Sequence, residues 1–149
     1  RRPEGVDQDV FDGMVKKIRE DRFDFLSTFG KQFFGVGLIS RPVSQATLDW
    51  MQSICQLASP RATEACVRAF SETDFRRDLA AIQVPTLVIH GDNDQTVPIK
   101  NSGARMGEYL KQATYIVYDG APHGLFVTEK DKLNQDLTAF ITSSANGNQ

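Results

Sequence analysis

The 149-residue sequence is poor in cysteine: it has only Cys55 and Cys66, and neither lies in a Cys-x-x-Cys pair or beside a histidine. A disulfide-stapled scaffold and a zinc module are therefore both disfavoured. No apolar run approaches the roughly 18 residues that cross a bilayer, and no apolar signal segment follows the first residues. The sequence therefore predicts no membrane partner and a cytoplasmic location.

An excess of charge of one sign is also missing, since 17 Lys and Arg face 19 Asp and Glu, for a net charge of −2. A nucleic-acid-binding domain usually carries a basic surface, so we expect no nucleic acid partner. With 40% hydrophobic and 24% charged residues, the composition is that of a soluble globular protein. The sequence leaves open whether the protein forms a homo-oligomer.

The first half of the chain has the apolar spacing of helices. Apolar side chains recur at three- and four-residue steps, and Ser44 and Ser59 stand where helix N-caps are expected. The four stripes contain Val10, Phe11, Met14 and Ile18; Phe25, Leu26, Phe29 and Phe33; Leu48, Met51, Ile54 and Cys55; and Ala62, Ala65, Cys66, Ala69 and Phe70. This pattern predicts an all-helical segment.

The periodicity changes at residue 84. Residues 84–89 form a continuous apolar and β-branched run, which is typical of a buried parallel strand, and residues 115–118 form a second such run. Residues 101–111 are predicted to be a helix between them, which makes a right-handed parallel crossover. Thr128 and Asp131 resemble a capping box before a last helix, and residues 143–149 are predicted to be a disordered tail.

Two strands are too few for an independent sheet. A typical sheet has about five or six strands, and parallel strands need cover on both faces. We therefore interpret the chain as one piece of a larger α/β fold.

Acidic residues and a histidine follow the two predicted strands. Asp92 and Asp94 come after the first strand and His123 after the second. Neighbouring parallel strands would bring them out side by side at one edge, where a carboxylate can orient an imidazole that acts as a general base. Turn-forming aspartates and a surface histidine are the alternative explanation, and spacing alone does not choose between Asp92 and Asp94. His90, at the end of the first strand, is better explained by packing.

Residues 84–98, VPTLVIHGDNDQTVP, and residues 119–124, DGAPHG, resemble the acid and histidine segments of the α/β-hydrolase fold. The resemblance is closest to the cofactor-free haloperoxidase and arylesterase branch, also called non-haem chloroperoxidases. Short segments at residues 3–6, 21–22, 33–35, 43–44 and 70–76 resemble the helical cap of that branch and its return to the core. The implied fold class is α/β: the C-terminal part of a three-layer α/β-hydrolase sandwich with a mostly parallel sheet. The implied domains are a helical cap at 1–72 and part of the core at 73–142.

The resemblance also implies roles for individual residues. The triad acid falls on Asp94 and the base on His123, which leaves Asp92 as a turn-forming neighbour. Phe29 and Phe33 fall on cap positions that face the acyl pocket, and Val97 falls on the pocket wall. Plain cap packing is the alternative for the two phenylalanines. No metal and no other cofactor is implied.

The family's nucleophile elbow, Gly-x-Ser-x-Gly, occurs nowhere in the sequence. Because this fold places the nucleophile before the acid and the histidine, we expect it upstream of Arg1, in an N-terminal half of the same enzyme. The 149 residues alone are then predicted to be inactive. The complete protein would be a serine hydrolase for small carboxylic esters, with lactones, amides and perhydrolase or haloperoxidase chemistry left open.

Two alternatives stay open beside the serine hydrolase. One is a non-catalytic ligand-binding module that keeps the fold. The other is an enzyme like the haloalkane dehalogenases, with an aspartate nucleophile upstream.

Overall fold

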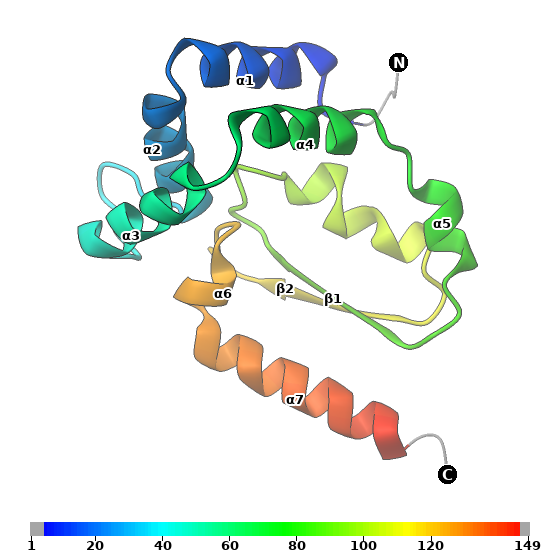
Figure 1. Cartoon of the computed structure of the whole chain (residues 1–149). Helices are drawn as coiled ribbons and strands as arrows, with labels where there is room; N and C mark the ends of the chain where they lie inside the picture. Colours follow the sequence, from blue (N-terminus) through cyan, green and yellow to red (C-terminus); the bar gives the residue numbers. More distant parts are fainter. Residues whose placement is uncertain (1–4, 147–149) are drawn as a thin grey trace. The chain divides into compact units, whose positions relative to one another are not determined.

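A computed structural model describes residues 5–146, and the chain divides between Phe75 and Arg76 into two compact units (Figure 1). The first unit is helical, and the second contains the strands. The division lies three residues after the predicted boundary between residues 72 and 73. The assignment of these units as cap and core stays a prediction.

Four helices make up the described part of the first unit, one for each predicted apolar stripe: α1 (Gln8–Glu20), α2 (Arg22–Phe33), α3 (Gln45–Gln56) and α4 (Pro60–Glu72). The predicted N-caps are confirmed. The hydroxyl of Ser44 accepts a hydrogen bond from the Thr47 amide at 3.1 Å, and that of Ser59 accepts one from the Ala62 amide at 3.4 Å. Each cap satisfies an amide that the first turn of a helix leaves unpaired.

The helices of the first unit pack in pairs. Helix α1 lies against α4, and α2 lies against α3 (Figure 1). Val15, Ile18 and Val67 form the buried cluster between α1 and α4. Three further apolar side chains are half-buried against it: Phe11, Met14 and Phe25. Burial of this apolar area is the main stabilising contribution in the unit.

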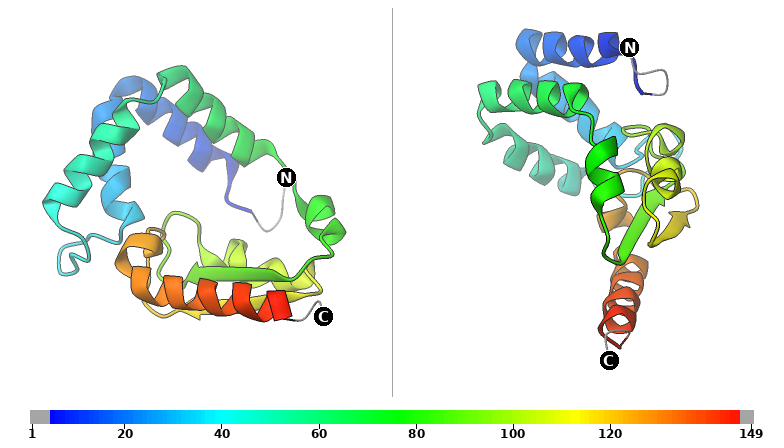
Figure 2. Two further views of the ribbon diagram at one scale, coloured as in Figure 1. Left: turned by 60° about the horizontal axis from the view of Figure 1, so that its bottom comes forward. Right: turned by 90° about the vertical axis from the view of Figure 1, so that its right-hand side faces the viewer.

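The second unit is built on two adjacent strands, β1 (Thr86–Gly91) and β2 (Ala113–Tyr118). They pair in parallel, with Thr86 opposite Ala113 and Gly91 opposite Tyr118 (Figure 2). The predicted parallel pair is therefore confirmed. The elements of the second unit follow one another along the chain in the order α5 (Arg76–Ala81), β1, two 3₁₀ helices, β2, α6 (Leu125–Thr128) and α7 (Lys130–Asn146).

The connection between the strands differs from the prediction. Instead of an α-helix over residues 101–111, it forms two 3₁₀ helices, η1 (Ile99–Asn101) and η2 (Gly103–Glu108). Gly103 and Gly107 disfavour a continuous α-helix because glycine has a low helix propensity. Gly103 is also buried against β1, where the backbone must approach closely.

The C-terminal helix also departs from the sequence prediction in two ways. Thr128 ends α6 rather than capping α7, and its buried hydroxyl has no hydrogen-bond partner within residues 5–146. Residues 143–146 are helical, so the predicted disordered tail is wrong for them, and residues 147–149 lie outside the described residues. Thr142 and Ser143 donate their hydroxyls to carbonyls of their own helix, at 2.8 and 2.9 Å, which makes polar residues compatible with it.

Two side-chain contacts tie helix α7 to the end of β2. Figure 2 shows α7 from two further sides. The Tyr118 hydroxyl donates to Asp136 at 2.6 Å, and the Lys132 ammonium lies 3.4 Å from the centre of the tyrosine ring. Burial of the phenol, with the hydrogen bond to Asp136, raises the pKa of Tyr118 to about 12. Between residues 5 and 146, no helix combines the length and apolarity needed to cross a membrane.

Candidate active site

The two strands end level with each other, so the loops that follow them leave from the same edge. Gly91 is the last residue of β1 and lies opposite Tyr118, the last residue of β2. A side chain at Gly91 would overlap the backbone of Ala121, and the Asn93 amide donates to the Ala121 carbonyl at 3.2 Å. The absence of a Cβ at Gly91 therefore lets the loops after β1 and β2 touch.

Asp92 holds the turn that follows β2. Its Oδ1 accepts a hydrogen bond from the Gly120 amide at 2.7 Å. Gly120 has a φ of +67°, in the left-handed region that favours glycine. Spacing left Asp92 and Asp94 as alternatives, and the resemblance made Asp92 the turn-forming one. In the structure Asp92 indeed bonds to backbone rather than to the histidine.

Asp94 and His123 are in direct contact. Asp94 Oδ2 lies 2.6 Å from Nδ1 of His123, while Asp94 Oδ1 accepts hydrogen bonds from the amides of Thr96 at 2.8 Å and Val97 at 2.7 Å. The Asp94 side chain is only 3% exposed, whereas that of His123 is 34% exposed. Since a carboxylate accepts, Nδ1 of His123 carries the proton, and Nε2 is the nitrogen able to accept one.

The pair lines a recess of about 210 Å³ in the second unit. Polar groups and apolar side chains share its wall, which is the mixture expected where an organic substrate meets a catalytic group. The lining residues are Ile89, His90, Gly91, Asp94, His123, Leu125 and Phe126. Among the described residues, no three or more His, Cys, Asp or Glu side chains gather as metal ligands.

His90 contacts the same carboxylate, which the sequence did not indicate. Its Nε2 lies 3.1 Å from Asp94 Oδ2 and 2.9 Å from the carbonyl oxygen of Val97. A Cβ at Gly103 would overlap the His90 ring, so the glycine in η2 makes room for the imidazole. The sequence carried only a weak signal for this contact. His90 and Gly103 are thirteen positions apart, and nothing in their spacing indicates that the glycine leaves room for the ring.

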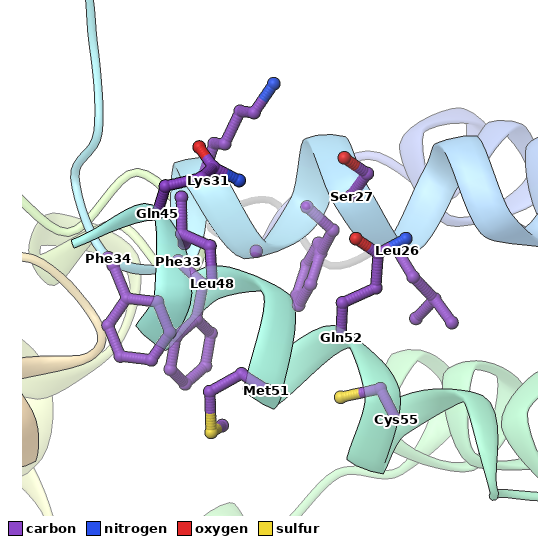
Figure 3. Close-up of a pocket in the computed structure, with 12 residues that line it drawn as sticks. Leu26, Ser27, Lys31, Phe33, Phe34, Gln45, Leu48, Met51, Gln52 and Cys55 are labelled. Atoms are coloured by element: carbon purple, nitrogen blue, oxygen red, sulfur yellow. The ribbon is translucent and has the colours of Figure 1, made fainter. Parts of the chain in front are cut away.

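The three predicted substrate-binding residues fall in both units. Phe29 and Phe33 line a cavity of about 100 Å³ between α2 and α3, together with Phe34, Leu48 and other side chains (Figure 3). The rings of Phe33 and Phe34 lie 5.1 Å apart at their centres. Val97, in the loop after β1, is 39% exposed. Their role in substrate binding stays a prediction.

The sequence model of the α/β-hydrolase fold family matches residues 37–130 of this chain. The chain belongs to the α/β-hydrolase fold family. A non-heme haloperoxidase of Rhodococcus erythropolis is 40% identical over 144 residues, with 95% of this chain and 52% of that protein covered. A bifunctional esterase/perhydrolase of Acinetobacter calcoaceticus is 35% identical over 143 residues, with 95% and 51% covered. The crystal structure of a bromoperoxidase from Bacillus anthracis is 38% identical and superposes with a TM-score of 0.90, covering 94% of this chain and 51% of that one.

The chain spans about half the length of the curated relatives it matches, and that half is the C-terminal one. These findings confirm the predicted resemblance to the non-haem haloperoxidase branch. They also confirm the predicted fold class, the C-terminal part of an α/β-hydrolase.

Proposed function

We propose that the chain is the C-terminal part of a serine hydrolase for small carboxylic esters, in which His123 is the general base and Asp94 orients it. The observation that carries the proposal is the 2.6 Å contact between the buried Asp94 carboxylate and Nδ1 of His123. The two amides on Asp94 Oδ1 hold that carboxylate in place. An Asp–His pair with this geometry keeps the imidazole in the tautomer that a hydroxyl nucleophile needs.

The nucleophile would come from the N-terminal half that the relatives carry. Its serine hydroxyl attacks the acyl carbon while Nε2 of His123 takes the hydroxyl proton and then gives it to the departing alkoxide. A water molecule next loses a proton to the same nitrogen and attacks the acyl-enzyme. The bond between the acyl carbon and the serine oxygen breaks, His123 returns the proton to that oxygen, and the carboxylic acid leaves. Asp94 stabilises the imidazolium in both steps. Amides that hold the oxyanion belong to the same missing half, and no step calls for a cofactor.

The acyl group would meet apolar side chains. The recess beside His123 carries Leu125 and Phe126, and we assign Phe29, Phe33 and Val97 to the substrate pocket of the complete enzyme. Apolar walls with few polar groups select small, weakly polar acyl chains. The printed names of the relatives, which include an esterase, favour the same substrate class.

Perhydrolysis is a second reaction that the relatives' names favour, since they include a haloperoxidase and an esterase/perhydrolase. In this reaction hydrogen peroxide replaces water. It gives a proton to His123 and attacks the acyl-enzyme. The bond to the serine oxygen breaks, His123 gives the proton to that oxygen, and a peracid leaves. The same Asp94–His123 pair serves both reactions because only the attacking hydroxyl-bearing molecule changes.

The test uses the complete enzyme, meaning this chain joined to the N-terminal half. We expect hydrolysis of p-nitrophenyl acetate that a fluorophosphonate abolishes, and no turnover above buffer from the 149 residues alone. The Phe33→Leu variant should change the preference among longer acyl chains. A folded complete enzyme without ester turnover would favour a ligand-binding module. Halide release from haloalkanes that is insensitive to the fluorophosphonate would favour an aspartate nucleophile.

A further inference from the structure

We infer that His90 is a positioning residue: its N–H holds the Val97 carbonyl, lies beside Asp94, and so fixes the carboxylate that orients His123. The inference rests on the proposed function. His90 needs no contact with substrate or with the nucleophile, because its effect would pass through Asp94. The alternative is that His90 only fills space at the end of β1.

The protonation of His90 follows from its partners. Nε2 lies 2.9 Å from the carbonyl oxygen of Val97, which can only accept a hydrogen bond. Nε2 therefore carries the proton and donates it to Val97, and the same nitrogen lies 3.1 Å from Asp94 Oδ2. Asp94 Oδ2 thus accepts a hydrogen bond from Nδ1 of His123 and has the polar N–H of His90 as a close electrostatic neighbour.

Val97 closes this arrangement into a ring of hydrogen bonds. Its amide donates to Asp94 Oδ1 at 2.7 Å, and its carbonyl accepts from His90. Asp94 Oδ1 and the His90 ring are thereby tied to one short loop, while Oδ2 is held by His123. A carboxylate held on both oxygens cannot rotate about its Cβ–Cγ bond without breaking bonds on each side, which keeps Oδ2 aimed at His123.

The His90 ring is itself confined. Its side chain is 13% exposed, and a Cβ at Gly103 would overlap its Nδ1. Since β1 fixes the backbone of His90 and η2 covers the ring, the imidazole has little freedom to turn away from Asp94. A pre-ordered donor costs less entropy per hydrogen bond than a mobile one.

The experiment compares His90→Leu with His90→Gln in the complete enzyme, with p-nitrophenyl acetate as the substrate. Leucine removes the donor and keeps an apolar bulk, whereas the glutamine amide can place an N–H near the position of Nε2. We expect His90→Leu to lower kcat about threefold to tenfold with KM little changed, because the loop that holds Asp94 loses one neutral hydrogen bond. His90→Gln should recover most of kcat.

A double-variant cycle separates positioning from packing. On an Asp94→Asn background, His90→Leu should add little further loss, because its effect passes through the side chain already changed. A full multiplicative loss on that background, or a wild-type kcat for His90→Leu alone, would overturn the inference. Should His90→Leu not fold, the low-field proton resonance on Nδ1 of His123 decides: its retention in His90→Gln supports the inference, and its disappearance overturns it.

Failure of the proposed function has a different signature. If His123→Ala and Asp94→Asn keep full activity, the proposed pair is not catalytic. If those variants lose activity while His90→Leu does not, only the role of His90 is wrong.

Discussion

The interior of the first unit and the interior of the second unit differ in the interactions that they contain. In the first unit the buried cluster is purely apolar, made of Val15, Ile18 and Val67. In the second unit the loops after β1 and β2 enclose Asp94, the one charged residue that is buried among residues 5–143, where burial is described. Each of its oxygens contacts two nitrogen donors, at distances from 2.6 to 3.1 Å.

This difference teaches where changes should affect stability and where they should affect chemistry. Apolar packing is non-directional. The loss of a methyl group in the first unit therefore lowers the free energy of unfolding without changing the orientation of a reactive side chain. Hydrogen bonds on a buried carboxylate are directional, so a small change there alters where an imidazole points. Substitutions can sharpen or break this contrast.

The largest effect is expected for His123→Ala in the complete enzyme. If His123 is the proposed general base, its removal should lower kcat by about 10⁴-fold or more, because the proposed serine hydroxyl would lose its proton acceptor. Thermal unfolding should change little, since the His123 side chain is 34% exposed. Ester turnover and a melting curve measure both quantities. A wild-type kcat for His123→Ala would contradict the view that changes in the second unit act on the chemistry.

Next comes Asp94→Asn, with Asp92→Asn as its matched control. The carboxamide that replaces the Asp94 carboxylate would favour the wrong tautomer of His123, so we expect a loss of kcat on the order of 10³- to 10⁴-fold. Asp92→Asn should stay near the wild-type rate, because a carboxamide oxygen can still accept the Gly120 amide. The opposite ranking, measured with the same ester, would move the acid to Asp92.

Gly91→Ala should cost both stability and activity. The new Cβ would overlap the Ala121 backbone, so the loops must separate, at a cost of about 1–3 kcal/mol in unfolding free energy. Gly13→Ala in α1 is the control, because a Cβ there meets nothing within 4 Å. That change should stabilise α1 by about 0.5–1 kcal/mol. Equal effects of the two substitutions in denaturant titrations would contradict the contrast.

Val67→Ala tests whether a change in the apolar cluster of the first unit affects stability alone. Loss of two buried methyl groups should lower the unfolding free energy by about 1–3 kcal/mol, while kcat of the complete enzyme stays unchanged. Denaturant midpoints and steady-state kinetics on the same preparation give the two values. A large fall in kcat at full folding would show that packing in this unit also aims the catalytic groups.

The smallest effect concerns pH. The pKa of Tyr118 is raised from 10.0 to about 12 by burial and by the hydrogen bond to Asp136, so the folded state favours the neutral phenol. Its contribution to stability is full below pH 10 and should be lost as the pH rises to about 12. Phenolate absorbance and unfolding across that range measure this, and Tyr118→Phe should remove the component. An unchanged alkaline profile in Tyr118→Phe would refute the assignment.

Local signals in the sequence predicted the elements well where they were strong. The stripes of the first half and the caps at Ser44 and Ser59 gave the helices, since N-cap chemistry acts within one turn. The same local reasoning was wrong at Thr128 and at residues 143–146, where polar side chains are compatible with helix. It also missed the two 3₁₀ helices between β1 and β2, and the approach of Gly103 to the His90 ring.

By itself, the sequence determined the class of this protein, the two parallel strands, and the three side chains from which an acid and a base could be drawn. Those features depend on periodicity and on short motifs, which neighbouring residues fix. Spacing left Asp92 and Asp94 open and the resemblance favoured Asp94, but only the tertiary structure shows that Asp94 contacts His123 and that His90 lies beside the carboxylate. The physical reason is that both findings depend on ångström-scale contacts between loops that the parallel register of β1 and β2 brings together.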